Sequence, residues 1–137
     1  MNRTLLFACL AATVLACRHE TLDEKICRQT RDFTQQSCPR PMDPYTVLDS
    51  MVYVPGTRTM SYHYSMSGKM DTSSVYNEAM KDMFYTDLLD NIRQNPGLNE
   101  LKEHGVTFRY VYSSGKDAST EYMSFTYPPA DYTTRRR

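Results

Sequence analysis

The chain has 137 residues, which suits one domain with its own core and leaves little room for a second. Its 16 basic and 16 acidic residues balance, but the basic ones include Arg3 and the terminal run at 135–137. Without those four, 12 basic residues remain against 16 acidic ones, so the body is mildly acidic and a nucleic-acid partner is disfavoured. We expect the terminal run to be a solvated tail, with contact to anionic lipid headgroups as the alternative.

The first seventeen residues predict a bacterial lipoprotein signal. Arg3 gives a positive start, residues 5–15 are apolar, and the small residue Ala16 stands directly before Cys17. The apolar stretch is too short for a membrane-spanning helix, which needs about 20 residues. We therefore expect cleavage after residue 16 and lipid, palmitate included, on Cys17. That lipid would hold the protein at the bacterial envelope, on the outer membrane facing the periplasm or the cell surface; an ordinary secretory signal is the alternative.

The cysteine count agrees with this interpretation. Cleavage removes Cys9 and lipidation uses Cys17, which leaves Cys27 and Cys38 as a candidate disulfide in an oxidising compartment. A disulfide needs Cα atoms closer than about 7 Å, whereas one continuous helix would separate these two by roughly 16 Å. Either the helix breaks between the two cysteines or there is no bridge.

In chain order, the first predicted element after the signal is a short helix from residue 21. Thr21 and Glu24 have capping-box spacing. The helix should end before Cys38, where prolines 39, 41 and 44 predict an extended linker. We therefore divide the chain into a signal peptide (1–16), a lipid-anchored helix with a proline-rich linker (17–45), a domain (46–132) and a basic tail (133–137).

Two β-hairpins are predicted in the domain. The first spans 46–66 around a turn at 55–58, and the second joins 106–112 to 120–127 around a turn at 113–117. Between them, a long helix capped by Ser73 or Ser74 carries an apolar stripe, and a shorter helix stops at Gly105. The stripe consists of Tyr76, Met80, Met83, Phe84, Leu88 and Ile92. The expected fold class is α+β: an antiparallel sheet of about four strands on one long and one short helix, preceded by the N-terminal helix.

Three stretches carry a resemblance to a known group. They are Asn95-Pro96-Gly97-Leu98, the segment 105–112, and the closing Pro129-Ala130-Asp131-Tyr132. In pattern and order, residues 38–132 resemble a group of small, uncharacterised envelope lipoproteins of gut-type bacteria. The resemblance implies the same lipoprotein placement and a similar small α+β domain, and it brings no site residues with it.

No motif commits the chain to a catalytic chemistry. The run Ser113-Ser114-Gly115-Lys116 matches the S-x-x-K pattern of penicillin-recognising enzymes, whose serine starts a buried helix. Here the match falls in a predicted turn and no K-T-G partner follows. The pair Asp87 and Asp90 is expected on the solvated face of the long helix. Phosphate-binding glycine loops, nucleophile elbows and dinucleotide fingerprints are missing from the sequence.

No metal or cofactor is expected either. His63 and His104 have no ligand partners at a specific spacing, and the i,i+4 pair of Glu100 and His104 suits a solvated helix face. Met60, Met66 and Met70 near His63 could suit Cu(I). Strand alternation, however, points Met60 and Met66 one way and His63 the other, so methionine as core filler is favoured.

Tyrosine is the most distinctive residue type, with 11 tyrosines and no tryptophan. A tyrosine ring buries area while its hydroxyl keeps a hydrogen bond, which favours binding surfaces. The candidate binding residues are Tyr62, Tyr64, Tyr110, Tyr112 and Tyr122. The alternative is that these rings pack beneath the helices with their hydroxyls at the edge.

The sequence therefore predicts a lipid-anchored envelope protein that acts by binding, with no cofactor and no evident catalytic site. Its partners would be the membrane, through Cys17, and a protein or glycan of the envelope. An inhibitor of a wall-degrading enzyme, using the 113–118 turn, is the first alternative. An envelope enzyme is the second, and a pocket uniting His63 with an acidic partner would favour it.

Overall fold

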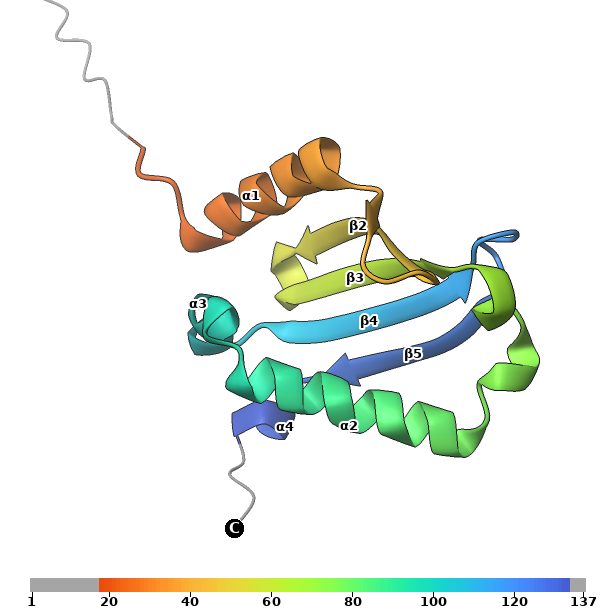
Figure 1. Cartoon of the computed structure of the whole chain (residues 1–137). Helices are drawn as coiled ribbons and strands as arrows, with labels where there is room; N and C mark the ends of the chain where they lie inside the picture. The colour runs from red at the N-terminus through yellow and green to blue at the C-terminus, as the bar shows by residue number, and fades with distance from the viewer. Residues whose placement is uncertain (1–17, 134–137) are drawn as a thin grey trace, which may run out of the picture.

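The computed structural model describes residues 18–133, so Cys17 and the arginine run at 135–137 lie outside the described residues. The sheet has five strands, and Figure 1 shows helices on one of its faces. Helix α1 (Leu22–Ser37) lies along the β2 side of that face, and helix α2 (Glu78–Gln94) lies along the β5 side. Within the described range, no helix is long and apolar enough to cross a bilayer.

Helix α1 begins where the sequence predicts, at a complete capping box. The Thr21 side chain accepts from the Glu24 N–H, and the Glu24 carboxylate accepts from the Thr21 N–H. The helix packs on the sheet through buried Ile26, 3% exposed, and buried Thr30. The predicted lipid-anchored segment 17–45 thus contributes a helix to the packed core, and α1 is part of the folded domain.

The sheet has the strand order β1 to β5, with β1 (Arg40–Pro41), β2 (Thr46–Val54), β3 (Thr59–Met66), β4 (Thr107–Ser114) and β5 (Glu121–Tyr127). Both predicted hairpins are present, as β2–β3 and β4–β5. The prediction of four antiparallel strands is wrong in two respects. The proline-rich segment adds β1 at the edge, and β3 pairs with β4 in parallel.

The parallel pair follows from the helices between the two hairpins. The chain leaves β3 at Met66, returns through α2 and re-enters the sheet at Thr107, so β4 starts beside the start of β3. A crossover of this length is what a parallel pair requires. The alternating strand at 59–66 was predicted correctly. The sequence pattern did not specify which strands of the two hairpins pair with each other.

Helix α2 starts later than expected. Residues Ser73–Val75 form a short 3-10 turn, and the cap is Asn77, whose side chain accepts from the Met80 N–H. Met83 is half exposed rather than part of the buried stripe, because it lies nine residues, or two and a half turns, from buried Ile92. Leu89 takes its place in the core.

Three short elements complete one end of the domain. A 3-10 turn (Pro96–Leu98) leads directly into α3 (Asn99–Glu103), and α4 (Pro129–Thr133) follows β5. The sequence did not predict α4. Arg93 of α2 donates to the Asp131 carbonyl at 2.6 Å, and the Tyr132 hydroxyl donates to the Val106 carbonyl at 2.8 Å. These bonds fasten α4 beneath α2.

The core lies between the helices and the inward-facing side chains of the strands. Its fully buried large side chains are Tyr127, Phe108, Met60, Met66, Ile92 and Val106. The other face of the sheet carries mainly polar residues, among them Ser65 and Arg109, and Val52 and Val54 at its β2 edge are each 46% exposed. The fold is therefore a two-layer α+β sandwich with one solvated sheet face.

The expected disulfide is absent. Cys27 and Cys38 are both free, because α1 continues unbroken from Leu22 to Ser37 and keeps their Cα atoms roughly 16 Å apart along its axis. The Cys27 thiol contacts the Tyr53 carbonyl at 3.8 Å, while burial raises the pKa of the Cys38 thiol.

Candidate functional site

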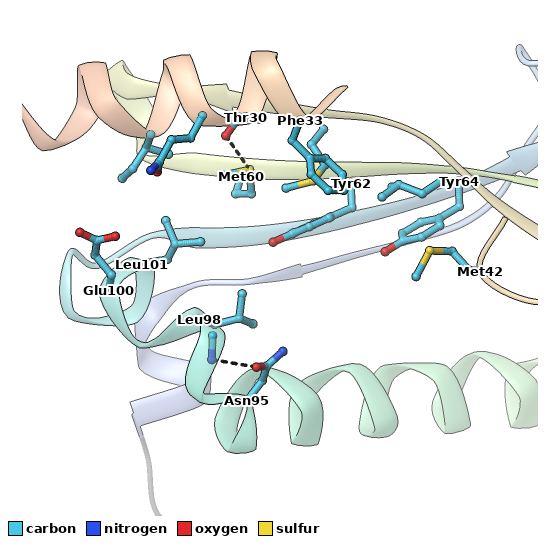
Figure 2. Close-up of a pocket in the computed structure, with 15 residues that line it drawn as sticks. Thr30, Phe33, Met42, Met60, Tyr62, Tyr64, Asn95, Leu98, Glu100 and Leu101 are labelled. Atoms are coloured by element: carbon cyan, nitrogen blue, oxygen red, sulfur yellow. Dashed lines mark hydrogen bonds between the residues drawn. The ribbon is translucent and has the colours of Figure 1, made fainter. Parts of the chain in front are cut away.

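A groove of about 610 Å³ lies between α1 and the segment 95–101, above the inner face of β2 and β3. We call it the α1–α3 groove. Figure 2 shows its two walls and its floor. Its lining is mostly apolar and comprises Ile26, Gln29, Thr30, Phe33, Met42, Leu48, Met51, Met60, Tyr62, Tyr64, Asn95, Gly97, Leu98, Glu100 and Leu101.

The floor combines thioethers with aromatic rings. Met60 is 2% exposed, and its sulfur accepts from the Thr30 hydroxyl at 3.8 Å, which joins floor to wall. Tyr62 and Tyr64 come from the same strand and are half buried. Figure 2 shows their hydroxyls pointing away from α1, toward the side where Leu98 and α2 lie. At the far end, Met42 is 53% exposed. The groove is thus an accessible apolar surface built on a packed core.

The second wall is held by a local turn. The Asn95 side chain accepts from the Gly97 N–H at 2.9 Å. A Cβ at Gly97 would lie 3.1 Å from the Asn95 side-chain oxygen, so a larger residue would strain this turn. The turn positions Leu98 and Leu101 beside the groove, where both remain partly exposed.

Two polar contacts join α1 to α3 and to His104, the residue that caps the C-terminus of α3. Lys25 pairs with Glu100 at 2.7 Å, and His104 Nε2 lies 2.7 Å from Asp23 Oδ1. The same Asp23 oxygen accepts from the Tyr53 hydroxyl at 2.7 Å. The bond from Tyr53 and then that with His104 hold the pKa of Asp23 below its ordinary value. Glu100 is thus exposed, as its spacing suggested, whereas His104 is partly buried, and both side chains contact α1.

Four of the five candidate tyrosines form one stacked cluster. The Tyr62 and Tyr110 rings stack with centroids 4.8 Å apart, and so do the rings of Tyr64 and Tyr112. The parallel pairing of β3 with β4 produces this arrangement, since Tyr62 lies opposite Tyr110 and Tyr64 opposite Tyr112. We call these four residues the tyrosine cluster. Phe84 of α2 meets the Tyr112 ring edge-on at 5.4 Å. Tyr110 and Tyr112 are therefore buried, in line with the packing alternative, whereas Tyr62 and Tyr64 are half buried and line the groove.

The hydroxyls of this cluster differ from those of the other buried tyrosines. Tyr53, Tyr76, Tyr122, Tyr127 and Tyr132 each donate a hydrogen bond to a protein oxygen. Among residues 18–133, no protein group is hydrogen-bonded to the four cluster hydroxyls. Arg93 Nε is the one fully enclosed side-chain nitrogen or oxygen in that range without a partner, so the cluster hydroxyls keep accessible surface.

Burial also sets the protonation state of the cluster. It raises the pKa of Tyr64 to about 12, and it raises the pKa values of Tyr62, Tyr110 and Tyr112 as well. Neutral hydroxyls at physiological pH can both donate and accept hydrogen bonds. The groove floor therefore offers polar contacts without charge.

Tyr122 belongs elsewhere. Its ring stacks on Tyr76 at 4.8 Å, and its hydroxyl donates to Asp71 at 2.7 Å. A register shift in β5 opposite Tyr112 accompanies this placement. The structure thus separates Tyr122 from the four tyrosines with which the sequence grouped it.

The S-x-x-K match forms the β4–β5 turn. Buried Ser114 Oγ accepts from the backbone N–H groups of Lys116 and Asp117, and the Asp117 carboxylate accepts from Ser119 and Thr120. These bonds hold an exposed turn in one shape and bring no lysine amine to a serine. The pattern is explained by turn geometry.

His63 shares a shallow recess of about 390 Å³ with Asp49, Ser65 and Ser113. The Asp49 carboxylate accepts from Ser65 at 3.0 Å, and burial lowers the pKa of His63. The sulfurs of Met60 and Met66 accept instead from Thr30 and Thr46 in the core. Among the described residues, no three His, Cys, Asp or Glu side chains gather as a metal site would require.

The sequence did not reveal the groove, although it contained part of the signal. Phe33 belongs with Leu22 and Ile26 to a thin apolar stripe on the first helix, and Leu98 and Leu101 are apolar residues of the shorter one. Neither the sequence of α1 nor that of the segment 95–101 indicates that the space between them is unfilled. The polar contacts across that space join residues 75 and 81 positions apart, which no local pattern could indicate.

Comparison with known proteins adds a family and a fold. The family described as "Domain of unknown function (DUF8479)" matches residues 21–123. No curated protein matches the sequence.

Two solved structures share the fold. One is the Pseudomonas aeruginosa protein PA3611, described as a "putative secreted protein", with a TM-score of 0.62 at 14% identity over 83% of this chain and 99% of that chain. The other is EpsS, the pilotin of the Vibrio vulnificus type 2 secretion system, with a TM-score of 0.59 at 4% identity over 82% and 93%. Identities this low show a shared fold alone.

Proposed function

Since the chain belongs to the DUF8479 family, whose function is unknown, we propose from its groove that it is an envelope protein that binds a helix of a protein partner. Lipid on Cys17 would hold it at the membrane. The observation that carries the proposal is the α1–α3 groove, an apolar recess that the chain's own described residues leave open. Two fold neighbours described as a secreted protein and as a secretion-system pilotin are compatible with an envelope binding role.

The construction of the groove favours a helix as its occupant. Its floor is the face of the β2–β3 pair, where backbone groups are used in the strand ladder, and its walls are helical segments. The groove therefore offers an occupant side-chain contacts and no free backbone groups. An extended segment would bury its own N–H and C=O groups unpaired, at about 1–3 kcal/mol each, whereas a helix satisfies its own.

The mostly apolar lining favours a protein over a glycan. Sugars commonly pack against an open aromatic face, and one face of each of the Tyr62 and Tyr64 rings is covered by Tyr110 or Tyr112. A protein partner with apolar side chains uses this surface better.

The test is site-specific crosslinking in intact cells. A photoreactive phenylalanine analogue at Phe33, in the groove, should capture one protein, and the same analogue at Val54, 46% exposed but outside the groove, should not. Leu98→Asp should abolish the Phe33 product. Equal capture at both positions, or none at Phe33, would contradict the proposal. Fractionation of Cys17→Ser tests the anchor separately: we expect release from the membrane fraction.

A second candidate function rests on the β4–β5 turn. Residues 115–120 are exposed, project from the end of the sheet (Figure 1), and are held by the Ser114 and Asp117 bonds. Inhibitors of wall-degrading enzymes need such a rigid projecting loop. If the protein is one, it should inhibit a lysozyme, and Lys116→Ala should weaken that inhibition.

A further inference from the structure

The hydroxyls of Tyr62 and Tyr64 have no use inside this molecule. Tyr127 and Tyr132 donate to the carbonyls of Tyr85 and Val106, but no protein group among the described residues meets either groove hydroxyl. Both hydroxyls keep accessible surface, which solvent can reach, so for stability alone phenylalanine would serve about as well at both positions. A polar group on an apolar floor that lacks an internal partner indicates a partner outside.

These two hydroxyls form a fixed pair. Each ring is stacked within 11° of parallel on its neighbour in β4, so both side chains are held in one orientation. Tyr62 and Tyr64 are two residues apart on one strand and point to the same face, which separates them by about 6.5–7 Å. The groove therefore presents two hydrogen-bonding groups at a defined spacing.

An α-helix can match that spacing. Its residues i and i+4 lie on one face, with a rise of about 6 Å between them. An extended segment could match it too, but the groove gives that segment no backbone partners. A helix running along β3 would place two successive polar side chains, one turn apart, over the two hydroxyls.

The remaining surface is nearly uncharged. Glu100 is the one ionisable acid or base of the groove lining apart from the tyrosines, and it is paired with Lys25. Phe33, Leu98 and Leu101 offer apolar contact on the two walls. An occupant needs apolar side chains toward the walls and only a narrow polar strip toward the floor.

We propose that Tyr62 and Tyr64 are the specificity-determining pair of the α1–α3 groove, and that they select a helix with oxygen-bearing polar side chains at positions i and i+4. Asn, Gln, Ser, Asp and Glu can each accept from a tyrosine hydroxyl. This inference rests on the proposed function, because it names the kind of helix the groove takes. A purely apolar helix would leave both hydroxyls desolvated without partners and would be rejected.

The probe is a displayed library of 18-residue peptides with a fixed leucine face and two varied positions at i and i+4. It is selected on the full chain in detergent micelles. The comparison proteins are the double variant Tyr62→Phe, Tyr64→Phe and, as matched control, Tyr85→Phe, whose exposed hydroxyl also lacks a partner but lies outside the groove. Leu98→Asp identifies peptides that bind in the groove.

On the wild-type chain we expect oxygen-bearing residues at both varied positions. A selected peptide should bind roughly 25-fold more tightly than its Ala, Ala version, at about 5-fold per hydrogen bond. That ratio should fall to near 1 on the double variant and stay unchanged on Tyr85→Phe. Two results would overturn the inference but not the proposed function. One is that groove-binding peptides keep their preference for oxygen-bearing residues on the double variant, and the other is that they show no such preference on the wild type. Failure to select any peptide sensitive to Leu98→Asp would overturn the proposed function as well.

Discussion

Single Tyr→Phe variants should fall into two classes according to how much unfolding free energy each one loses. Tyr132→Phe deletes the donor to the Val106 carbonyl, a 2.8 Å bond between residues that are 7% and 0% exposed. The carbonyl is left buried without that bond, so we expect a loss of about 1–3 kcal/mol. Tyr127→Phe, whose hydroxyl donates to the Tyr85 carbonyl at 2.9 Å, should behave alike. Tyr62→Phe and Tyr64→Phe should stay within about 0.5 kcal/mol of wild type.

Urea unfolding followed by circular dichroism measures these differences, and thermal melts provide a second reading. At this chain length, 1 kcal/mol corresponds to a shift in Tm of roughly 4 °C, so the two classes separate clearly. The result that would refute the reasoning is a loss above about 1 kcal/mol for Tyr62→Phe or Tyr64→Phe. It would mean that these hydroxyls serve the fold, and the case for an external partner would then disappear.

Three further predictions concern other parts of the domain. Gly115→Ala would place a Cβ 2.6 Å from the Met66 carbonyl oxygen and should cost about 1–3 kcal/mol in unfolding free energy; an unchanged urea midpoint would show that the turn can relax. The pKa of Asp23 is below its ordinary 3.8, so its carboxylate stabilises the fold above about pH 4 and this stabilisation is lost as pH falls through the lowered pKa. Asp23→Asn should therefore flatten the acid side of the stability curve, and an unaltered slope below pH 4 would contradict that. Because Cys27 and Cys38 are free, both should react with a thiol reagent in denaturant without reductant; protection of the two together would indicate a disulfide.

Sequence patterns predicted the helices and strands of this fold well, because helix capping and strand alternation act between neighbouring residues. The capping box at Thr21 starts α1, and the alternation from Met60 to Met66 marks the inward face of β3. Both depend on residues within a few positions of one another. The parallel β3–β4 contact joins segments about 48 residues apart and depends on where α2 returns the chain. No periodicity in either strand records that choice.

The candidate site was predicted in part for the same reason. Tyr62, Tyr64, Tyr110 and Tyr112 were grouped because all four lie on predicted strands, and the structure gathers these four. Their stacking needed the parallel pairing. The groove itself needed α1 placed on β2 and linked to α3 by Asp23 and Lys25, and sequence spacing carries no information about a space between two elements.

Where a helix binds can be measured most directly with the methionine methyl groups, of which the chain has nine. In a methyl NMR spectrum of the chain with a selected helical peptide, binding in the α1–α3 groove predicts shifts at Met42, Met51 and Met60, which line it. Met83 of α2, half exposed and outside the groove, should stay in place. Shifts at Met83 with none at the three groove methionines would contradict helix binding at this site.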